Sequence, residues 1–292
     1  MAAYSADAIE IFGKGVLEAE GVLIDKEGNA YGGGTSNGVI YKVSPEGVVS
    51  EIATIPNSMP LGIAMDRKNN LVFCDARRQA VMRLTPSGQV SMMTDRVGTV
   101  AFTLPNFASY DAEGNLYVSN SSTRDIDHLL VELVNPEPNG ALVCIRPNGK
   151  GEVVATGLYL ANGVAIDPKE EAVYVLESSR KDCVRIAIKK DGSFGKPEIY
   201  AKDFPGLPDG MAFDVEGNLY ITIPLVVKYE GTVPANQILE GASDLWERHE
   251  RVGSIVVNQI VRVDASGNWT LFVEDLGGQK LAAPTNCAFG GP

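Results

Sequence analysis

The sequence predicts an all-β fold, a single six-bladed β-propeller domain that spans residues 1–292 and has four strands in each blade. Two long stretches, "LPNFASYDAEGNLYVSN" at 104–120 and "LPDGMAFDVEGNLYITI" at 207–223, follow the same pattern and share 8 of 17 residues. Further copies recur along the chain, and each reads as four short strands separated by turns. Helical periodicity is almost absent. A repeat of this length that encodes four strands is typical of one propeller blade.

The repeat has a constant internal order. Each copy opens with an apolar strand that ends in Asp, followed by a polar turn of the type "DxEGN" and a second strand such as "LYVSN". A third and a fourth strand follow, as in "GALVCIRPNG" and "GEVVATG", and the Pro-Asn-Gly or Ala-Ser-Gly between them favours a hairpin. Six copies begin in this way, which predicts six blades.

Two insertions interrupt the pattern, at about 121–139 in the third copy and at about 228–256 in the fifth. Within the second insertion, residues 236–250 are expected to form a short amphipathic helix. Both insertions follow a second strand, so we expect them to crowd one face of the propeller. Long loops in such a place often shape a ligand entrance.

The sixth copy is incomplete, because it stops after "NCAFGGP". Only the N-terminal segment "AIEIFGKG" remains to close the ring, so the last blade would still lack about two strands of the four in a propeller blade. We favour a chain that is shorter than its natural gene product over an unusual closure.

Composition excludes several classes of function. A net charge of −12 argues against a nucleic-acid partner, because phosphate binding needs a basic face. The four cysteines form no CxxC pair, and Cys74 and Cys144 lie in apolar runs that predict buried free thiols. The start of the chain lacks the pattern of a signal peptide and no stretch is long enough to span a membrane, so we expect a cytoplasmic protein.

The residue that opens each copy is the main candidate for function. In a propeller the innermost strands line a central channel, so equivalent positions form a ring around the axis. Any one of these residues could simply cap a turn, but turn chemistry has no use for a glutamate. Five of the six side chains carry oxygen. The register positions are Glu20, Leu61, Asn106, Asn162, Asp209 and Asn286.

A converging set of carboxylates and carboxamides suits one hard divalent cation. Ca²⁺ is the first choice, with Mg²⁺ and Mn²⁺ as alternatives. Zn²⁺ is less favoured, because the ring contains neither His nor Cys. His128 and His249 both lie in the insertions, and we interpret them as solvated loop residues. No GxSxG motif is present.

With these motifs in their order, the sequence resembles the SMP-30/gluconolactonase/luciferin-regenerating-enzyme-like family of six-bladed propellers. The motifs are "EG" at 20–21, "LPN" ending at Asn106, "ANGVAID" from Ala161 and "PDGMAFD" from Pro208. The resemblance implies a divalent metal in the channel, held by Glu20, Asn106, Asn162 and Asp209. It also implies hydrolysis of lactones, or of phosphotriester-type substrates in some relatives, with Asp209 as catalytic base or nucleophile.

The sequence departs from the sugar-lactone members of that family at two positions. Where they often have Arg two residues before the ligand Asn and Asp directly after it, this chain has Leu104 and Phe107. The resulting apolar wall favours a lactone or ester that is less polar than a sugar lactone. Asn286 is expected to line the channel without binding the metal directly.

We therefore predict a hydrolase of small lactones or esters, with the metal as Lewis acid and Asp209 as general base or nucleophile. A phosphotriesterase is one alternative, and a non-catalytic ligand-binding propeller with a structural cation is another. A strictosidine-synthase-like propeller is a third, against which the four-ligand set argues. The predicted partner is the small-molecule substrate, with neither nucleic acid nor membrane.

Overall fold

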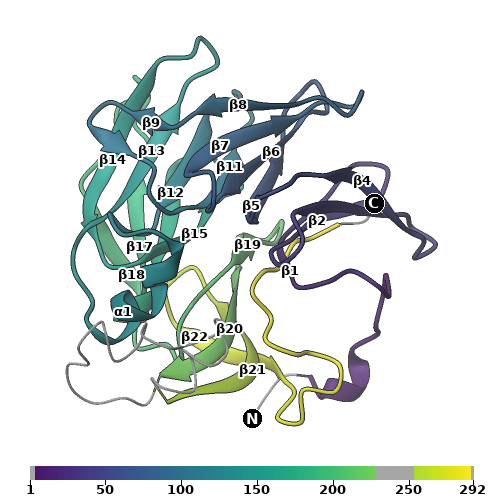
Figure 1. Cartoon of the computed structure of the whole chain (residues 1–292). Coiled ribbons are helices and arrows are strands. Elements are labelled where there is room, and N and C mark those ends of the chain that lie inside the picture. The colour runs from purple at the N-terminus through teal and green to yellow at the C-terminus, as the bar shows by residue number, and fades with distance from the viewer. Residues whose placement is uncertain (1–3, 228–252, 291–292) are drawn as a thin grey trace.

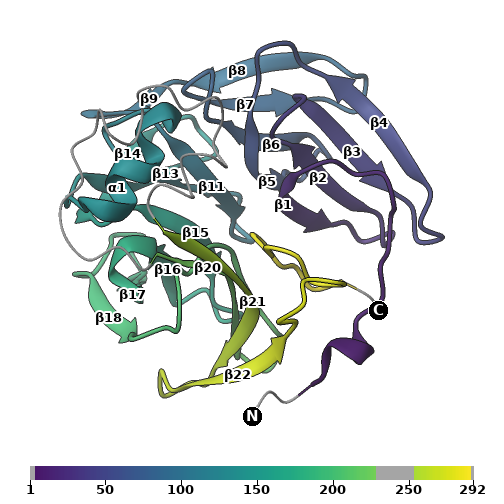
Figure 2. The ribbon, with the colours of Figure 1, turned by 60° about the horizontal axis from the view of Figure 1, so that its bottom comes forward.

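The computed structural model describes residues 4–227 and 253–290, and it shows five four-stranded antiparallel sheets arranged like blades around an axis (Figures 1 and 2). Blade one contains β1 (Ala19–Ile24), β2 (Ala30–Gly34), β3 (Val39–Val43) and β4 (Val49–Thr54). Blade two contains β5 (Pro60–Met65), β6 (Leu71–Asp75), β7 (Ala80–Leu84) and β8 (Val90–Thr94). Blade three contains β11 (Pro105–Tyr110), β12 (Leu116–Asn120), β13 (Gly140–Ile145) and β14 (Gly151–Leu158).

The last two blades follow the same order. Blade four contains β15 (Ala161–Ile166), β16 (Ala172–Glu177), β17 (Asp182–Ala187) and β18 (Glu198–Ala201). Blade five contains β19 (Met211–Phe213), β20 (Leu219–Val227), β21 (Ser254–Val263) and β22 (Trp269–Glu274). Outside the blades lie the pair β9 (Arg96–Val97) and β10 (Val100–Ala101), α1 (Leu129–Val134) and the 3₁₀ turns η1 (Ala6–Ala8), η2 (Ile126–His128) and η3 (Ser178–Arg180).

The repeated "DxEGN" phrase forms the turn between the first and second strand. In blade five, Asp214 Oδ1 accepts hydrogen bonds from the backbone N–H of Asn218 at 2.8 Å and of Glu216 at 2.9 Å. The Asn218 side chain returns a bond from Nδ2 to Asp214 Oδ2 at 2.7 Å. Gly217 between them has a φ of +86°, which favours glycine. This local network explains why the phrase recurs and why it sets the register of each hairpin.

The core lies between blades rather than within them. Four clusters of buried apolar side chains join neighbouring sheets, one at each junction from blade one to blade five. Cys74, Cys144 and Cys183 are fully buried in these clusters and are free thiols, which confirms the prediction for Cys74 and Cys144. Among the described residues no such cluster joins blade five to blade one.

The prediction of six blades is wrong for the described residues, which form five. The sixth copy contributes no strand, and residues 279–290 run as an irregular segment between blades five and one (Figure 2). The N-terminal segment does not close a sixth sheet either. Its single bridge joins Tyr4 to Val273 on the outer strand of blade five, with Tyr4 N donating to Phe272 O at 2.9 Å. A lone extended segment without neighbours cannot satisfy its backbone groups as a sheet.

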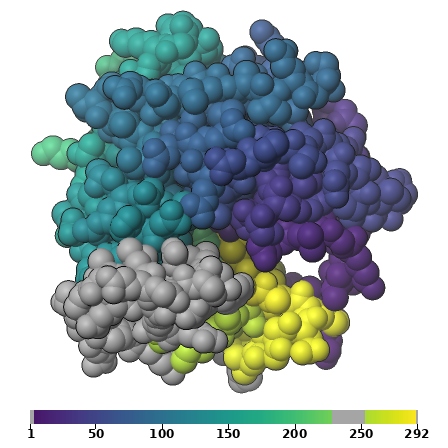
Figure 3. Space-filling model, in the orientation of Figure 1, coloured from purple at the N-terminus to yellow at the C-terminus, as the bar shows by residue number. Residues whose placement is uncertain are grey.

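The irregular segment nevertheless occupies the place between the first and last blades. The Thr222 hydroxyl donates to Thr285 O at 2.9 Å, and the Thr285 hydroxyl donates to Glu20 O at 3.3 Å. A side chain therefore connects blade five to the segment, and another connects the segment to blade one. In Figure 3 the C-terminal residues (yellow) lie beside the N-terminal ones (purple) at the surface.

Both insertions follow a second strand, as predicted. The first lies between β12 and β13 and contains η2 and α1. The second lies between β20 and β21, and its predicted helix at 236–250 falls outside the described residues. In the described part of the chain, none of the helices has the length and apolar character needed to cross a bilayer.

Candidate functional site

The register residues lie where the inner strands begin. Glu20, Asn106 and Asn162 are the second residues of β1, β11 and β15, and Asp209 directly precedes the Gly210 that leads into β19. Asn286 lies in the irregular segment. The inner strands pack against one another in order around the axis, β1 on β5, β5 on β11, β11 on β15 and β15 on β19.

Glycines set how closely the blades approach at this level. A Cβ on Gly21 would lie 2.5 Å from Leu61 O, and one on Gly62 would lie 2.5 Å from Phe107 Cα. A Cβ on Gly163 would lie 2.6 Å from Asp209 O, and one on Gly210 would lie 2.6 Å from Asn286 Cγ. At Gly21, Gly62 and Gly163 the backbone at the start of the next blade fills the space of a side chain, and at Gly210 Asn286 of the irregular segment fills it. Successive register positions are consequently neighbours around the axis.

The two carboxyl groups of the set interact in a buried environment. Burial and the nearby charge of Glu20 raise the pKa of Asp209 well above its ordinary value, and a hydrogen bond with Asn162 opposes that shift. Burial raises the pKa of Glu20 to about 7, against a smaller opposing effect of the Thr285 hydroxyl. Two half-buried carboxylates that repel each other are unfavourable when both are ionised, unless a positive charge accompanies them.

The two amide side chains present oxygens without partners. Asn106 and Asn162 are buried, and the Oδ1 atom of each has no hydrogen-bond partner within the described part of the chain. Asn162 Nδ2 donates to Ser178 Oγ at 3.2 Å, and Ser178 Oγ donates to Pro208 O at 2.7 Å. The Asn162 amide is thus held by its nitrogen, with its oxygen left over. A buried polar atom without a protein partner needs water, an ion or a ligand to satisfy it.

These features fit a hard divalent cation. The set comprises two half-buried carboxyls and two partnerless carboxamide oxygens, the donor type that Ca²⁺ prefers. The described residues contain no group of three or more His, Cys, Asp and Glu that could hold a metal, in keeping with a set that has only two carboxylates. The assignment of Glu20, Asn106, Asn162 and Asp209 as metal ligands stays a prediction that this donor chemistry supports.

The three predicted pocket residues have different surroundings. Leu104 is fully buried in the cluster between blades two and three. Phe107 packs in the cluster between blades three and four and also lines an axial cavity. Asn286 lies against Gly210, and its Oδ1 accepts the backbone N–H of Cys287 at 2.8 Å. Contact of these residues with substrate stays a prediction.

Hydroxyl groups that support the ring were missed at the level of sequence. Ser119 Oγ accepts the N–H of Phe107 at 3.0 Å, and Thr222 Oγ1 accepts the N–H of Gly210 at 2.9 Å. Together with Ser178, they hold the inner strands beside the register residues. The signal was the hydroxyl residue within the second strand, in "LYVS" and "LYIT". His128 is paired with Asp125, Nδ1 to Oδ1 at 2.7 Å, and His249 lies outside the described residues.

The protein is thus a β-propeller whose inner strands mostly begin with oxygen-bearing side chains. The family model that describes the SMP-30/gluconolactonase/LRE-like region matches residues 19–240, and the chain belongs to this family. This confirms the resemblance drawn from the motifs.

Individual relatives are distant. A strictosidine synthase-like protein of Arabidopsis thaliana is 25% identical over 74% of this chain and 59% of its own length. A gluconolactonase of Zymomonas mobilis is 27% identical over 58% of this chain and 50% of its own length. The chain thus spans little more than half the length of these relatives.

Solved structures show the same fold at low identity. A gluconolactonase of Xanthomonas campestris superposes with a TM-score of 0.70 at 16% identity, over 95% of this chain and 81% of the other. A calcium-binding protein, regucalcin, of Agrobacterium tumefaciens superposes with a TM-score of 0.63 at 13% identity, over 89% and 74%.

Proposed function

We propose that this protein is a divalent-metal-dependent hydrolase that opens a lactone or a related ester at the ring of register residues. The observation that carries the proposal is the combination of two half-buried, mutually repelling carboxyls with two buried, partnerless carboxamide oxygens. Membership in a family with gluconolactonase relatives supports the reaction class.

Glu20, Asn106, Asn162 and Asp209 would hold the cation, with Ca²⁺ as first choice. When bound, the cation would act as a Lewis acid toward the substrate carbonyl. The two asparagines are neutral and would leave most of its charge uncancelled. The regucalcin that shares this fold is a calcium-binding protein by its description, which supports calcium as the first metal to test.

Asp209 is the residue proposed to move the proton. Its carboxylate lies next to Glu20 and forms a hydrogen bond with Asn162, so it would stand at the proposed cation where the attacking water is activated. The carboxylate would take a proton from the attacking water, or attack the carbonyl carbon itself. The Ser178 hydroxyl, which bonds both Asn162 and Pro208 O, positions the two sides of the site.

The side chains around the ring favour a substrate that is less polar than a sugar lactone. Leu104 is fully buried in the core and Phe107 packs between blades, so neither position offers a hydrogen bond to a substrate hydroxyl. A polyhydroxylated ring would therefore lack partners here that an alkyl-substituted lactone does not need.

The test is a hydrolysis assay on protein first stripped of metal with a chelator. The panel contains gluconolactone, alkyl-substituted lactones, an aryl ester and an organophosphate triester, each with and without added Ca²⁺. We expect Ca²⁺-dependent turnover, with higher kcat/KM for alkyl lactones than for gluconolactone. Turnover confined to the triester would favour the phosphotriesterase. A metal-dependent rise in Tm without turnover on any substrate would contradict the hydrolase and favour a structural cation.

A further inference from the structure

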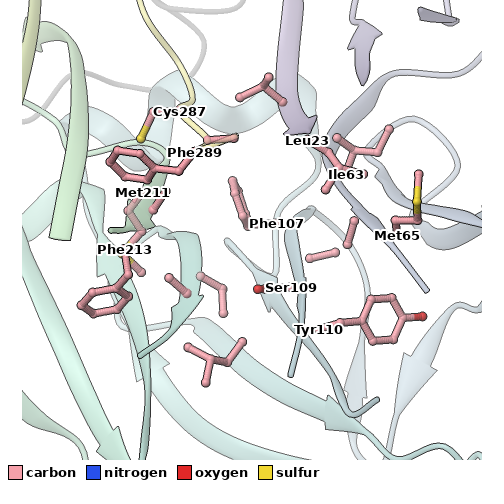
Figure 4. Close-up of a pocket in the computed structure, with 18 of the residues that line it drawn as sticks. Leu23, Ile63, Met65, Phe107, Ser109, Tyr110, Met211, Phe213, Cys287 and Phe289 are labelled. Atoms are coloured by element: carbon pink, nitrogen blue, oxygen red, sulfur yellow. The ribbon is translucent and has the colours of Figure 1, made fainter. Parts of the chain in front are cut away.

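A cavity lies on the axis, beyond the register residues. It has a volume of about 460 Å³ and is lined by the inner strands of all five blades and by the irregular segment, as Figure 4 shows. The lining residues begin one or two positions after the register residue and continue into the turn that follows the inner strand. The lining includes Leu23, Ile63, Met65, Phe107, Met211 and Phe289.

The cavity exists because the inner strands carry small side chains at one level. The third residue after the register position is Ala64, Ser109, Ala165 or Ala212 in four of the five blades. Short side chains at the level where the strands converge leave the axis unfilled. The residues one position further along are larger and form the wall toward the mouth, and they include Met65 and Phe213.

The mouth opens on the face of the turns between first and second strands. Val215, in the turn after β19, is 96% exposed and lines this end. The insertion that contains α1 instead follows the far end of a second strand, next to the start of β11, since Pro105 pairs with Asn120. The cavity and the first insertion thus belong to opposite faces of the propeller.

The lining determines the chemistry of an occupant. Asp214 is the single charged residue among the described lining residues, and its carboxylate is occupied by Asn218 and the N–H of Glu216. The remaining walls are mostly aliphatic and aromatic, and their polar side-chain groups are the hydroxyls of Ser109 and Tyr110 and the thiol of Cys287 (Figure 4). A charged ligand would be desolvated here without a partner, whereas an apolar one would release poorly bonded water.

We propose that this apolar cavity is a binding site for a small, neutral, largely apolar molecule, separate from the ring of register residues. Its volume lies within the range of known ligand pockets, roughly 300–1,000 Å³. The proposal does not depend on the hydrolase activity, because it rests on the other end of the channel.

The test is a titration of the protein with the neutral fluorescent probe N-phenyl-1-naphthylamine. We expect saturable binding with one site per chain. Met65→Lys places an amine in the wall and should raise the Kd about tenfold or more, since each factor of ten needs only about 1.4 kcal/mol. The matched control is Met92→Lys, because Met92 is exposed on β8, and it should change the Kd less than about twofold.

A second variant fills the cavity instead of charging it. Ser109→Phe should also weaken the probe about tenfold or more, and it provides the answer if Met65→Lys does not fold. Asp209→Asn and chelator should leave the probe Kd unchanged. Absence of saturable binding, equal weakening by Met92→Lys, or unchanged binding in folded Met65→Lys or Ser109→Phe protein would overturn the proposal. Loss of probe binding in Asp209→Asn would also overturn it.

Discussion

The two ends of the central channel are built by the same inner strands and yet differ in chemistry. At one end Asn106 and Asn162 present buried oxygens, and at the other Ser109 and Ala165 leave an apolar cavity. The two positions are only three residues apart in the sequence of each strand. The comparison teaches that the propeller fold brings the inner strands together around one axis. The residue that each strand places at a given level then determines which ligand can bind there.

The two ends also affect stability in opposite ways. Glu20 and Asp209 are held in an environment that raises the pKa of both carboxyls, so they disfavour folding at neutral pH when no cation accompanies them. The apolar end buries hydrocarbon, which favours folding, but its unfilled volume forgoes contacts. Ligands of opposite character should therefore stabilise the two ends.

The largest expected effect is a loss of hydrolase activity from a substitution at the polar end. Asp209→Asn should lower kcat on the best lactone by about 10³-fold or more, because it removes the proposed proton acceptor. The fold should persist, because a buried carboxyl is replaced by an amide of the same shape. Steady-state kinetics and thermal unfolding measure both.

The control for that variant is Asp203→Asn in the same connection between blades. Asp203 is exposed and has a φ of +60°, which Asn tolerates well, so activity should stay at the wild-type level. More than about a tenth of wild-type activity in Asp209→Asn would contradict its assigned role, since removal of a general base typically costs far more.

The next effect should disturb both ends at once. Gly62→Ala would place a Cβ 2.5 Å from Phe107 Cα and 2.7 Å from Asn106 O, so blades two and three would have to separate. We expect a loss of about 3 kcal/mol in the free energy of unfolding, measured by urea denaturation.

Gly277→Ala serves as the matched control, because its nearest atoms would lie 3.6 Å away and no strain is expected. If the two variants were equally stable, the close approach of neighbouring blades at Gly62 would be refuted.

A third prediction concerns the acidic pair Glu177 and Asp182. Glu177 and Asp182 are buried next to Ser178, and burial together with the charge of Glu177 raises the pKa of Asp182 to about 7. This value lies above the ordinary 3.8, so the folded state binds the extra proton between these pH values. Stability from this group is therefore present below about pH 4 and is lost as pH rises toward 7.

Urea unfolding of metal-free protein at pH 5 and pH 8 measures that loss. In wild type the free energy of unfolding should fall by an amount on the order of 2 kcal/mol from this group between pH 5 and pH 8. Asp182→Asn should not show this fall, so it should be more stable than wild type at pH 8. Arg180, 3.5 Å from Asp182, and Asp203 also act on this carboxyl, so the control is Asp95→Asn, an exposed carboxylate that does not act on Asp182. Parallel pH profiles for wild type and Asp182→Asn would show that the pair does not titrate in this range.

The smallest effect should be confined to the polar end. Ser178→Ala removes the hydrogen bonds to Asn162 Nδ2 and Pro208 O, which should cost about 1 kcal/mol of stability and weaken Ca²⁺ binding several-fold. Calorimetric titration with Ca²⁺ measures the affinity, and Ser266→Ala in an exposed turn is the control. Weakened probe binding at the apolar end in Ser178→Ala would show that the two ends are not independent.

Much of the fold could be predicted because its signals are local. Asp214 and Asn218 form the same turn in any chain that carries "DxEGN", so strand pairs and their register follow from a few neighbouring residues. The family was recognisable for the same reason, because its motifs stand at the strand starts. The number of blades could not be predicted in this way. A blade requires its strands to pair with one another, and the sixth copy does not bring such strands together.

The sequence by itself determined which residues open each inner strand, and with them the oxygen-bearing set of Glu20, Asn106, Asn162 and Asp209. Only the tertiary structure decided that the Asn106 and Asn162 oxygens lack partners, that Ser178 holds the amide of Asn162, and that the axis is hollow beside Ser109. The physical reason is that turns and strands depend on neighbours in the chain. Burial, pairing and empty volume depend instead on residues from different blades that meet only when the sheets pack.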